Sequence, residues 1–337
     1  MSLRVLTVDD SPFFLELLAG IIHSQPGLLH VGSARNGAEA VAMAAALAPD
    51  VITLDVEMPV MDGLAALPRI MASRPTRVIM VSSHTRRASA LTVRALALGA
   101  ADFVTKPADA LKDSYDALRA ELVEKILALA TPRAGEGRPV TARGGHLPRG
   151  AAPRIIVLGA STGGIAALTR IAGGLPRRPR CSLVAVQHLP GTYAQEFARS
   201  LAEACPCPVH LVRNGQLVAP GCLYVAQGGL HLAVHGAAFR VSRGAPVQGH
   251  VPSIDVTMES AARAFGSGVC GVLLTGMGRD GARGIGAIRD AGGMTIAQDE
   301  ATSVVFGMPR AAIEMGKVDV VLGLDGIARE VAELCGK

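Results

Sequence analysis

The sequence lacks tryptophan and holds few other aromatic residues, with 3 Tyr and 7 Phe among 337 residues. Proteins that bind single-stranded nucleic acid commonly stack the bases on aromatic side chains, so this composition gives such binding little support. The net charge of +5 does not alter that expectation. The charge is spread thinly, and the first 125 residues are slightly acidic. We therefore expect no nucleic-acid partner.

Long hydrophobic runs are also missing, since no apolar segment approaches the ~20 residues that a membrane-spanning helix needs. The N-terminal residues lead straight into a strand pattern without the features of a signal peptide. All six cysteines lie in the second half, with neither a CxxC pair nor a matched histidine spacing, which argues against zinc. We expect a cytoplasmic protein with reduced cysteines, no membrane insertion, and no cofactor in its second half.

The length favours two α/β domains, because single hydrophobic cores stop growing near roughly 250–300 residues. Residues 1–125 alternate short apolar runs with helical patterns, which predicts a doubly wound parallel sheet of the flavodoxin-like kind. Residues 126–152 are rich in Gly, Pro and Arg and predict a flexible linker. A second doubly wound α/β domain, of hydrolase type, is expected over residues 153–337, with a β-hairpin inserted at Cys222–Ser242.

Polar side chains gather at the predicted strand ends of the first domain. Asp9 and Asp10 follow the first strand, Asp55 ends the third, Ser82 follows the fourth and Lys106 follows the fifth. Carboxyl ends of parallel strands meet at one sheet edge. Clustered carboxylates repel one another unless a cation such as Mg²⁺ lies between them, and a carboxylate beside Mg²⁺ and Lys suits phosphoryl transfer.

Each residue also has a structural explanation. Asp9 or Asp10 could cap a helix that starts near Pro12, and Lys106 could be a surface charge. In combination, however, the segments Val8–Ser11, Asp55–Gly63, Val81–Ser83 and Phe103–Pro107 resemble the response-regulator receiver family over about the first 120 residues.

That resemblance implies a role for each residue. Asp55 would accept the phosphoryl group, and Mg²⁺ would be held by Asp10, Asp55 and the carbonyl of Glu57. Asp9 would assist through water, while Ser82 and Lys106 would contact the phosphoryl group. Phe103 falls where the family often has an aromatic switch residue, although a Phe on a strand is ordinarily part of the core.

A serine follows the first strand of the second domain, in the segment Gly159–Gly164, just before a helical pattern. The segment matches G-x-S-x-G, in which a sharp turn exposes the serine oxygen. It also approximates a Gly-rich nucleotide loop, with one departure. His188 lies just past the next strand at the same sheet edge, where it could take the serine proton, or could simply bond to backbone. Asp280, after a later strand, could orient that histidine or cap a helix.

Four segments of the second domain resemble the catalytic domain of the chemotaxis protein-glutamate methylesterases: Gly159–Gly164, Gln187–Pro190, Leu274–Gly281 and Val305–Pro309. That family carries a receiver in front of the hydrolase, as here. By position, Ser161 would be the nucleophile, His188 the base and Asp280 its orienter. The backbone amides of Thr162 and Met277 become candidates for an oxyanion hole.

The resemblance implies a phosphorylation-activated serine hydrolase that demethylates glutamate methyl esters on methyl-accepting chemotaxis receptors and deamidates receptor glutamines. A chemotaxis-type sensor histidine kinase would be the phosphodonor. Val251 stands where a basic residue is expected, which would affect substrate docking rather than chemistry. The alternative is a receiver fused to a nucleotide- or DNA-binding output that uses Ser161 and Asp280 only for turns and caps.

Overall fold

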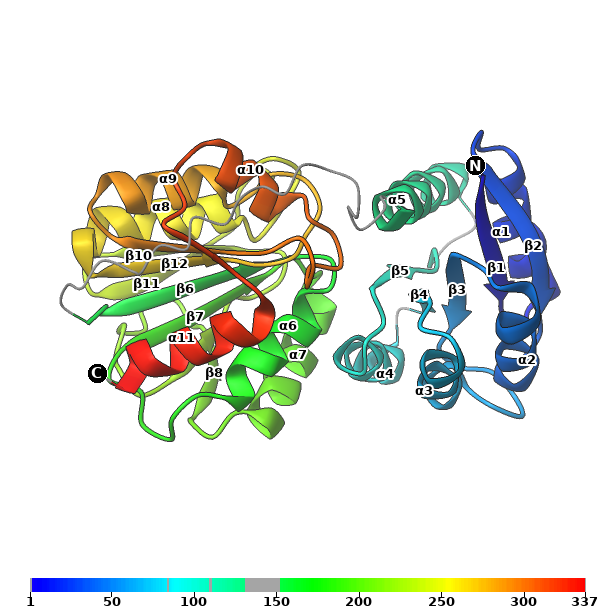
Figure 1. Ribbon diagram of the computed structural model, residues 1–337, viewed down its shortest axis with the longest axis horizontal. Helices are drawn as coiled ribbons and strands as arrows, with labels where there is room; N and C mark the ends of the chain where they lie inside the picture. Colours follow the sequence, from blue (N-terminus) through cyan, green and yellow to red (C-terminus); the bar gives the residue numbers. More distant parts are fainter. Residues whose placement is uncertain (1, 84, 109–110, 131–151, 337) are drawn as a thin grey trace. The chain divides into compact units, whose positions relative to one another are not determined.

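The computed structural model describes residues 2–83, 85–108, 111–130 and 152–336, and the chain forms two compact units (Figure 1). Most of the predicted linker, at residues 131–151, lies outside the described residues. The assignment of residues 126–130 to the linker was wrong, because helix α5 (Lys112–Ala130) continues through them. Ile126 and Leu129 are buried, so extending the helix removes apolar surface from water.

The first unit is built on a parallel five-stranded sheet in the order β2-β1-β3-β4-β5. β3 is buried along its whole length, as expected for a central strand covered on both faces. Edge strand β2, counted as the second strand, had no residues assigned to it from the sequence, because its partly exposed residues give no apolar run. The strands are β1 (Leu3–Val8), β2 (Leu28–Ala34), β3 (Val51–Asp55), β4 (Arg77–Ser82) and β5 (Asp102–Thr105).

Helices cover both faces of this sheet, with α1 and α5 in contact with each other and α2, α3 and α4 packed in sequence (Figure 1). Side-chain caps place the helix starts. Ser11 accepts a hydrogen bond from the Phe14 N–H, and Asn36 accepts one from the Glu39 N–H. Besides α5, the helices are α1 (Pro12–His23), α2 (Gly37–Leu47), α3 (Gly63–Ser73) and α4 (Arg86–Ala97).

The second unit contains a parallel seven-stranded sheet in the order β14-β13-β12-β6-β7-β9-β8. Its central strands β6, β7 and β12 are fully buried. The carboxyl ends of β6, β7 and β12 therefore lie side by side. The strands are β6 (Ile155–Ala160), β7 (Ser182–Gln187), β8 (Val209–Leu211), β9 (Leu223–Val225), β12 (Val269–Leu273), β13 (Met294–Gln298) and β14 (Val320–Leu322).

Helices α6, α7 and α11 cover one face of this sheet, and α8, α9 and α10 cover the other (Figure 1). The helices are α6 (Gly164–Gly173), α7 (Gly191–Ala204), α8 (Ile254–Phe265), α9 (Ala282–Asp290), α10 (Met308–Glu314) and α11 (Leu324–Gly336). A short 3₁₀ helix at Gly266–Gly268 leads into β12.

The predicted hairpin is present as β10 (His231–His235) paired antiparallel with β11 (Ala238–Ser242), and β10 packs on α8. Its predicted extent was too long, because Leu223–Val225 forms β9 in the main sheet instead. All three residues of β9 are buried, which suits a position between two strands. The two-domain α/β fold class is confirmed.

Candidate functional site

The carboxyl ends of β1, β3 and β5 bring two carboxylates and an ammonium group together. Lys106 Nζ lies 2.7 Å from Asp9 Oδ2 and 2.9 Å from Asp55 Oδ2. Asp10 completes the group, since ligand atoms of the three aspartates lie within 4.8 Å of one another. The ring of Phe14 borders the pocket, with Lys106 Nζ 4.6 Å from its centroid. The sheet edge thus assembles the cluster that strand-end positions predicted.

Burial raises the pKa of Asp55 to about 6, although Lys106 opposes the shift and Asp9 adds to it. Burial also acts to lower the pKa of Lys106, but the charges of Asp55 and Asp9 outweigh it, so the pKa of Lys106 is raised. Three carboxylates facing one ammonium leave excess negative charge. Such an all-oxygen donor set fits a hard divalent cation such as Mg²⁺.

The remaining receiver candidates have contacts with residues outside this cluster. Ser82 is buried at the end of β4, where its hydroxyl accepts a 2.8 Å hydrogen bond from Thr92 of α4. Phe103 is buried on β5, with Lys125 Nζ 5.1 Å from its ring centroid. The side chain of Glu57 is exposed and pairs with Arg87 at 3.1 Å. The phosphoryl, switch and metal-binding roles of these residues stay predictions.

Ser161 follows β6 on the turn that leads into α6. Its N–H donates to the Thr275 carbonyl at 3.0 Å, and its own carbonyl accepts from the Gly164 N–H at 2.7 Å. Gly163 takes the left-handed conformation just before α6 starts. The serine side chain remains partly exposed while its neighbours Thr162 and Gly163 are buried. This is the sharp strand–turn–helix arrangement that the motif predicted.

His188, directly after β7, connects Ser161 to Asp280. Its Nδ1 lies 3.1 Å from Ser161 Oγ, and its Nε2 lies 2.8 Å from Asp280 Oδ2. With the proton on Nε2, that N–H donates to the carboxylate and leaves Nδ1 free to accept from the serine hydroxyl. The three side chains that sequence analysis singled out thus form one continuous chain of polar contacts.

Asp280 is buried, and its carboxylate is held by the N-terminus of α8. The backbone N–H groups of Ile254 and Asp255 donate to it at 2.7 and 3.1 Å, and the Ser253 hydroxyl donates at 2.9 Å. Burial acts to raise the pKa of Asp280, but the hydrogen bonds and the charge of His188 outweigh it and lower the pKa. The aspartate stays ionised beside the imidazole, which suits the orientation of a base.

Asp280 does not cap its own helix, since the capping position of α9 is occupied by Gly281. The simple capping explanation of Asp280 is therefore wrong. A helix N-terminus stabilises a carboxylate through its free N–H groups and its dipole, and here the helix in question is α8, from another part of the chain. Local sequence gives no sign of that long-range contact.

Two further residues at this site were missed. His250 stacks on His188 with ring centroids 3.8 Å apart and an interplanar angle of 12°. Burial lowers the pKa of His250 to about 4, with His188 lowering it further and Asp280 opposing. Gln187 is buried, and its amide donates to the Ser161 carbonyl at 2.8 Å. Its position next to His188 was a usable signal, whereas His250 lies in a loop without periodicity.

The oxyanion-hole candidates lie next to the serine. Thr162 follows Ser161, and its carbonyl accepts from the Thr275 hydroxyl at 2.9 Å. Gly276 packs against Ser161, since a Cβ added to Gly276 would lie only 2.7 Å from Ser161 Cβ. Met277 is the next residue in the chain after this contact. Val251 lies in the loop between His250 and Ser253, and its carbonyl accepts from the Gly229 N–H at 3.2 Å. The roles of Thr162, Met277 and Val251 stay predictions.

Within the part of the chain that the structure describes, the aspartate cluster is the one group of His, Cys, Asp or Glu side chains spaced to hold a metal ion. All six cysteines are free thiols. No helix among the described residues is both long and apolar enough to cross a membrane.

An acidic pocket on a flavodoxin-like sheet, followed by a Ser–His–Asp arrangement on a second α/β unit, defines the class of receiver-linked hydrolases. Residues 5–115 match the response regulator receiver domain model, and residues 156–331 match the CheB methylesterase model. The chain belongs to the CheB methylesterase family and is therefore an ester hydrolase with a receiver domain. The binding-module alternative is not favoured.

Two similar proteins match nearly the whole length of this chain. A protein-glutamate methylesterase/protein-glutamine glutaminase of Symbiobacterium thermophilum is 41% identical over 99% of this chain and 98% of its own length. A second protein with this activity name, from Pseudomonas aeruginosa, is 45% identical over 97% of this chain and 95% of its own. The crystal structure of the Thermotoga maritima CheB methylesterase catalytic domain covers 55% of this chain and 100% of its own, with TM-score 0.52 and 35% identity.

Proposed function

We propose that this chain hydrolyses the γ-methyl esters of protein glutamates and deamidates protein glutamines, with Ser161 as nucleophile. The observation that carries the proposal is the contact of Ser161 Oγ with His188 Nδ1 at 3.1 Å, supported by Asp280 2.8 Å from the other ring nitrogen. A hydroxyl becomes a useful nucleophile at neutral pH when an oriented base receives its proton. The activity names of the relatives support the same chemistry.

In the first step, Ser161 Oγ attacks the ester carbonyl carbon while its proton passes to His188 Nδ1. Asp280 stabilises the resulting imidazolium. The backbone N–H groups of Thr162 and Met277 would donate to the tetrahedral oxyanion. His188 then gives its proton to the departing methoxide, which leaves as methanol. A water molecule hydrolyses the acyl-enzyme by the same path in reverse, and a glutamine amide would follow it with ammonia as the leaving group.

The acidic pocket is proposed to regulate this chemistry through phosphorylation of Asp55. Asp10, Asp55 and the carbonyl of Glu57 would hold Mg²⁺, which supplies charge neutralisation for the incoming phosphoryl group. Lys106 contacts Asp55 and would pair with a phosphoryl oxygen. Asp9 would act through water, and Ser82 would exchange its bond from Thr92 for one to the phosphoryl group. The catalytic unit would need no metal.

The remaining proposals follow from the family. The substrate proteins would be methyl-accepting chemotaxis receptors, the phosphodonor a chemotaxis-type sensor histidine kinase, and the site of action the cytoplasm.

The receiver would end near residue 130, where α5 ends, and the catalytic domain would begin at residue 153. A segment between them would connect the two units.

The test is the release of methanol from a methylated receptor cytoplasmic fragment and of ammonia from its unmethylated glutamine form. The wild-type chain should release both, and Ser161→Ala should release neither, because one nucleophile serves both reactions. Ammonia release that survives Ser161→Ala would separate the two activities and remove the deamidase part of the proposal. Methanol release that survives it would contradict the role of Ser161.

A further inference from the structure

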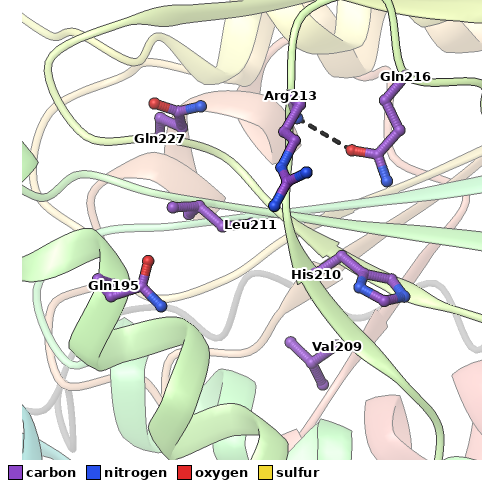
Figure 2. A pocket seen from close by; sticks show the side chains of 7 residues that line it. All are labelled: Gln195, Val209, His210, Leu211, Arg213, Gln216 and Gln227. Atoms are coloured by element: carbon purple, nitrogen blue, oxygen red, sulfur yellow. Dashed lines mark hydrogen bonds between the residues drawn. The ribbon is translucent and has the colours of Figure 1, made fainter.

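A second concave site lies at the end of the catalytic sheet, away from Ser161. The pocket has a volume of about 550 Å³ and lies between edge strand β8 and helix α7. Figure 2 shows that Gln195 enters it from α7, while Val209, His210 and Leu211 belong to β8 and Arg213 to the following loop. None of these residues belongs to the proposed hydrolytic machinery.

The lining of the pocket is cationic and rich in amides. It contains one arginine, one histidine and three glutamines, and no carboxylate among the described residues. Arg213 is exposed, and its guanidinium forms no ion pair within the described part of the chain. An unpaired guanidinium flanked by amide donors matches the geometry of a single carboxylate ligand. A nucleic acid would instead require several cations in a row.

Hydrogen bonds fix the loop that presents Arg213. The Arg213 N–H donates to Gln216 Oε1 at 2.9 Å, which leaves the Gln216 NH₂ group available as a donor (Figure 2). The Gln227 amide donates to the Val212 carbonyl at 2.6 Å, so the residue before Arg213 is held as well. Arg213 thus has an anchored backbone and a side chain that remains available, as a preformed subsite requires.

Arg213, at one end of the pocket, follows β8 at the same carboxyl edge of the sheet as the hydrolytic site. β7, which ends before His188, pairs parallel with β9, and β9 pairs parallel with β8. The segment after β9 packs on the loop after His188, because a Cβ added to Gly228 would be 2.4 Å from the Leu189 carbonyl oxygen. Ser161 follows β6, and three strand spacings separate β6 from β8, about 14 Å. One substrate segment can therefore reach both sites.

We propose that this pocket binds an acidic side chain of the substrate protein, a glutamate or aspartate close in sequence to the esterified glutamate. Arg213 pairs with its carboxylate, and the amide groups of Gln216 and Gln195 complete the site. The proposal rests on the proposed function and adds a determinant of which glutamate esters are selected. The ~14 Å separation corresponds to about four residues of extended chain or about ten residues of helix.

The test uses synthetic peptides that each carry one glutamate γ-methyl ester and a second glutamate about four to ten residues away. Each has a partner peptide with glutamine at that second position. Methanol release gives KM and kcat for the full-length wild-type chain, Arg213→Gln and Arg263→Gln. Arg263 is the matched control, an exposed arginine in the last turn of α8, at the opposite end of that helix from Asp280.

At one or more spacings, the wild-type KM should be about fivefold lower for the glutamate peptide than for its glutamine partner, and kcat should be equal for the two. A fivefold difference is expected for an exposed charge pair worth about 1 kcal/mol. Arg213→Gln should lose this preference, and Arg263→Gln should keep it. Retention of the preference by a folded Arg213→Gln, or its absence from the wild type at every spacing, overturns the subsite. Failure of the wild type to release methanol from any peptide overturns the proposed function instead.

Discussion

At the residue scale, Ser161, His188 and Asp280 depend on one another. His188 receives the proton of Ser161, and Asp280 holds the His188 ring in the orientation that this transfer needs. Their contacts of 3.1 and 2.8 Å join them into a single unit. Members of such units are strongly non-additive. Ser161→Ala, His188→Ala and the double variant should each lower kcat by about 10⁶-fold, and Asp280→Asn by about 10⁴-fold.

Methanol-release kinetics on the four variants check this prediction, with His235→Ala as a matched control at an exposed histidine of β10. The control should keep the wild-type rate. If the losses of Ser161→Ala and His188→Ala multiplied in the double variant, the two residues would act independently and the shared mechanism would be wrong.

His250 should make the stability of the catalytic unit depend on pH. Its pKa is lowered to about 4 from 6.5, chiefly by burial. Between pH 4 and 6.5 the unfolded chain therefore binds a proton more readily than the folded one, and acidification favours unfolding. Above pH 6.5 both states are neutral at His250, so its contribution to stability is fully present there.

The measurement is the melting temperature of the catalytic unit from pH 7 to 4. His250→Phe keeps a stacking ring on His188 but cannot titrate, so its stability should fall less steeply with acid than that of the wild type. Parallel curves for the two proteins would show that His250 does not carry this dependence. The slopes are compared, since Phe also changes the packing.

Residues at strand ends could be predicted from the sequence, and residues in loops could not. The positions of Asp55, Lys106, Ser161 and His188 follow from strand ends, since parallel strands carry their side chains to one edge. The contacts of His250 arise from a loop, where no period fixes the direction of a side chain. Loop residues are placed by packing between distant segments, and a single sequence does not contain that information.

At the element scale, α8 is the support of the catalytic aspartate. Ser253 caps this helix through the Val256 N–H and also donates to Asp280. Ser253→Ala should lower the stability of the catalytic unit by about 1–2 kcal/mol, the range for loss of a cap, and should also reduce kcat because Asp280 loses a partner. Urea unfolding and methanol release measure the two effects.

Thr85→Ala is the matched control. Thr85 caps α4 of the receiver by the same kind of bond, to the Ala88 N–H at 3.0 Å. It should cost similar stability in the receiver without changing kcat in the absence of a phosphodonor. If Ser253→Ala lost stability but kept the full kcat, the helix would be needed for the fold and not for the orientation of Asp280.

Element prediction succeeded where a strand forms a continuous apolar run and failed where polar residues interrupt that run. β6 and β7 show continuous apolar runs and were predicted. β13 was missed although it is buried, because Thr295 and Gln298 interrupt its short apolar run. Both polar side chains have specific partners, Thr295 with Asp319 and Gln298 with the Thr275 N–H. Satisfied polar groups can be buried, and sequence does not identify their partners in advance.

At the whole-molecule scale, the receiver unit precedes the hydrolase unit in the chain, and the receiver is proposed to regulate the hydrolase. Within the receiver, Lys106 contacts Asp9 and Asp55. Within the catalytic unit, His188 contacts Ser161 and Asp280. A regulatory link of about 1–3 kcal/mol, the usual range for coupled sites, corresponds to a rate change of about 5- to 150-fold.

The most direct measurement is methanol release from methylated receptor cytoplasmic fragments, with and without acetyl phosphate and Mg²⁺, for the wild type and Asp55→Asn. The wild-type rate should rise about 5- to 150-fold when both are present and should not rise when Mg²⁺ is chelated. Asp55→Asn should keep the basal rate and show no rise. A wild-type rate that ignores the phosphodonor, or a full rise in Asp55→Asn, would contradict the central claim that phosphorylation at Asp55 activates the hydrolase.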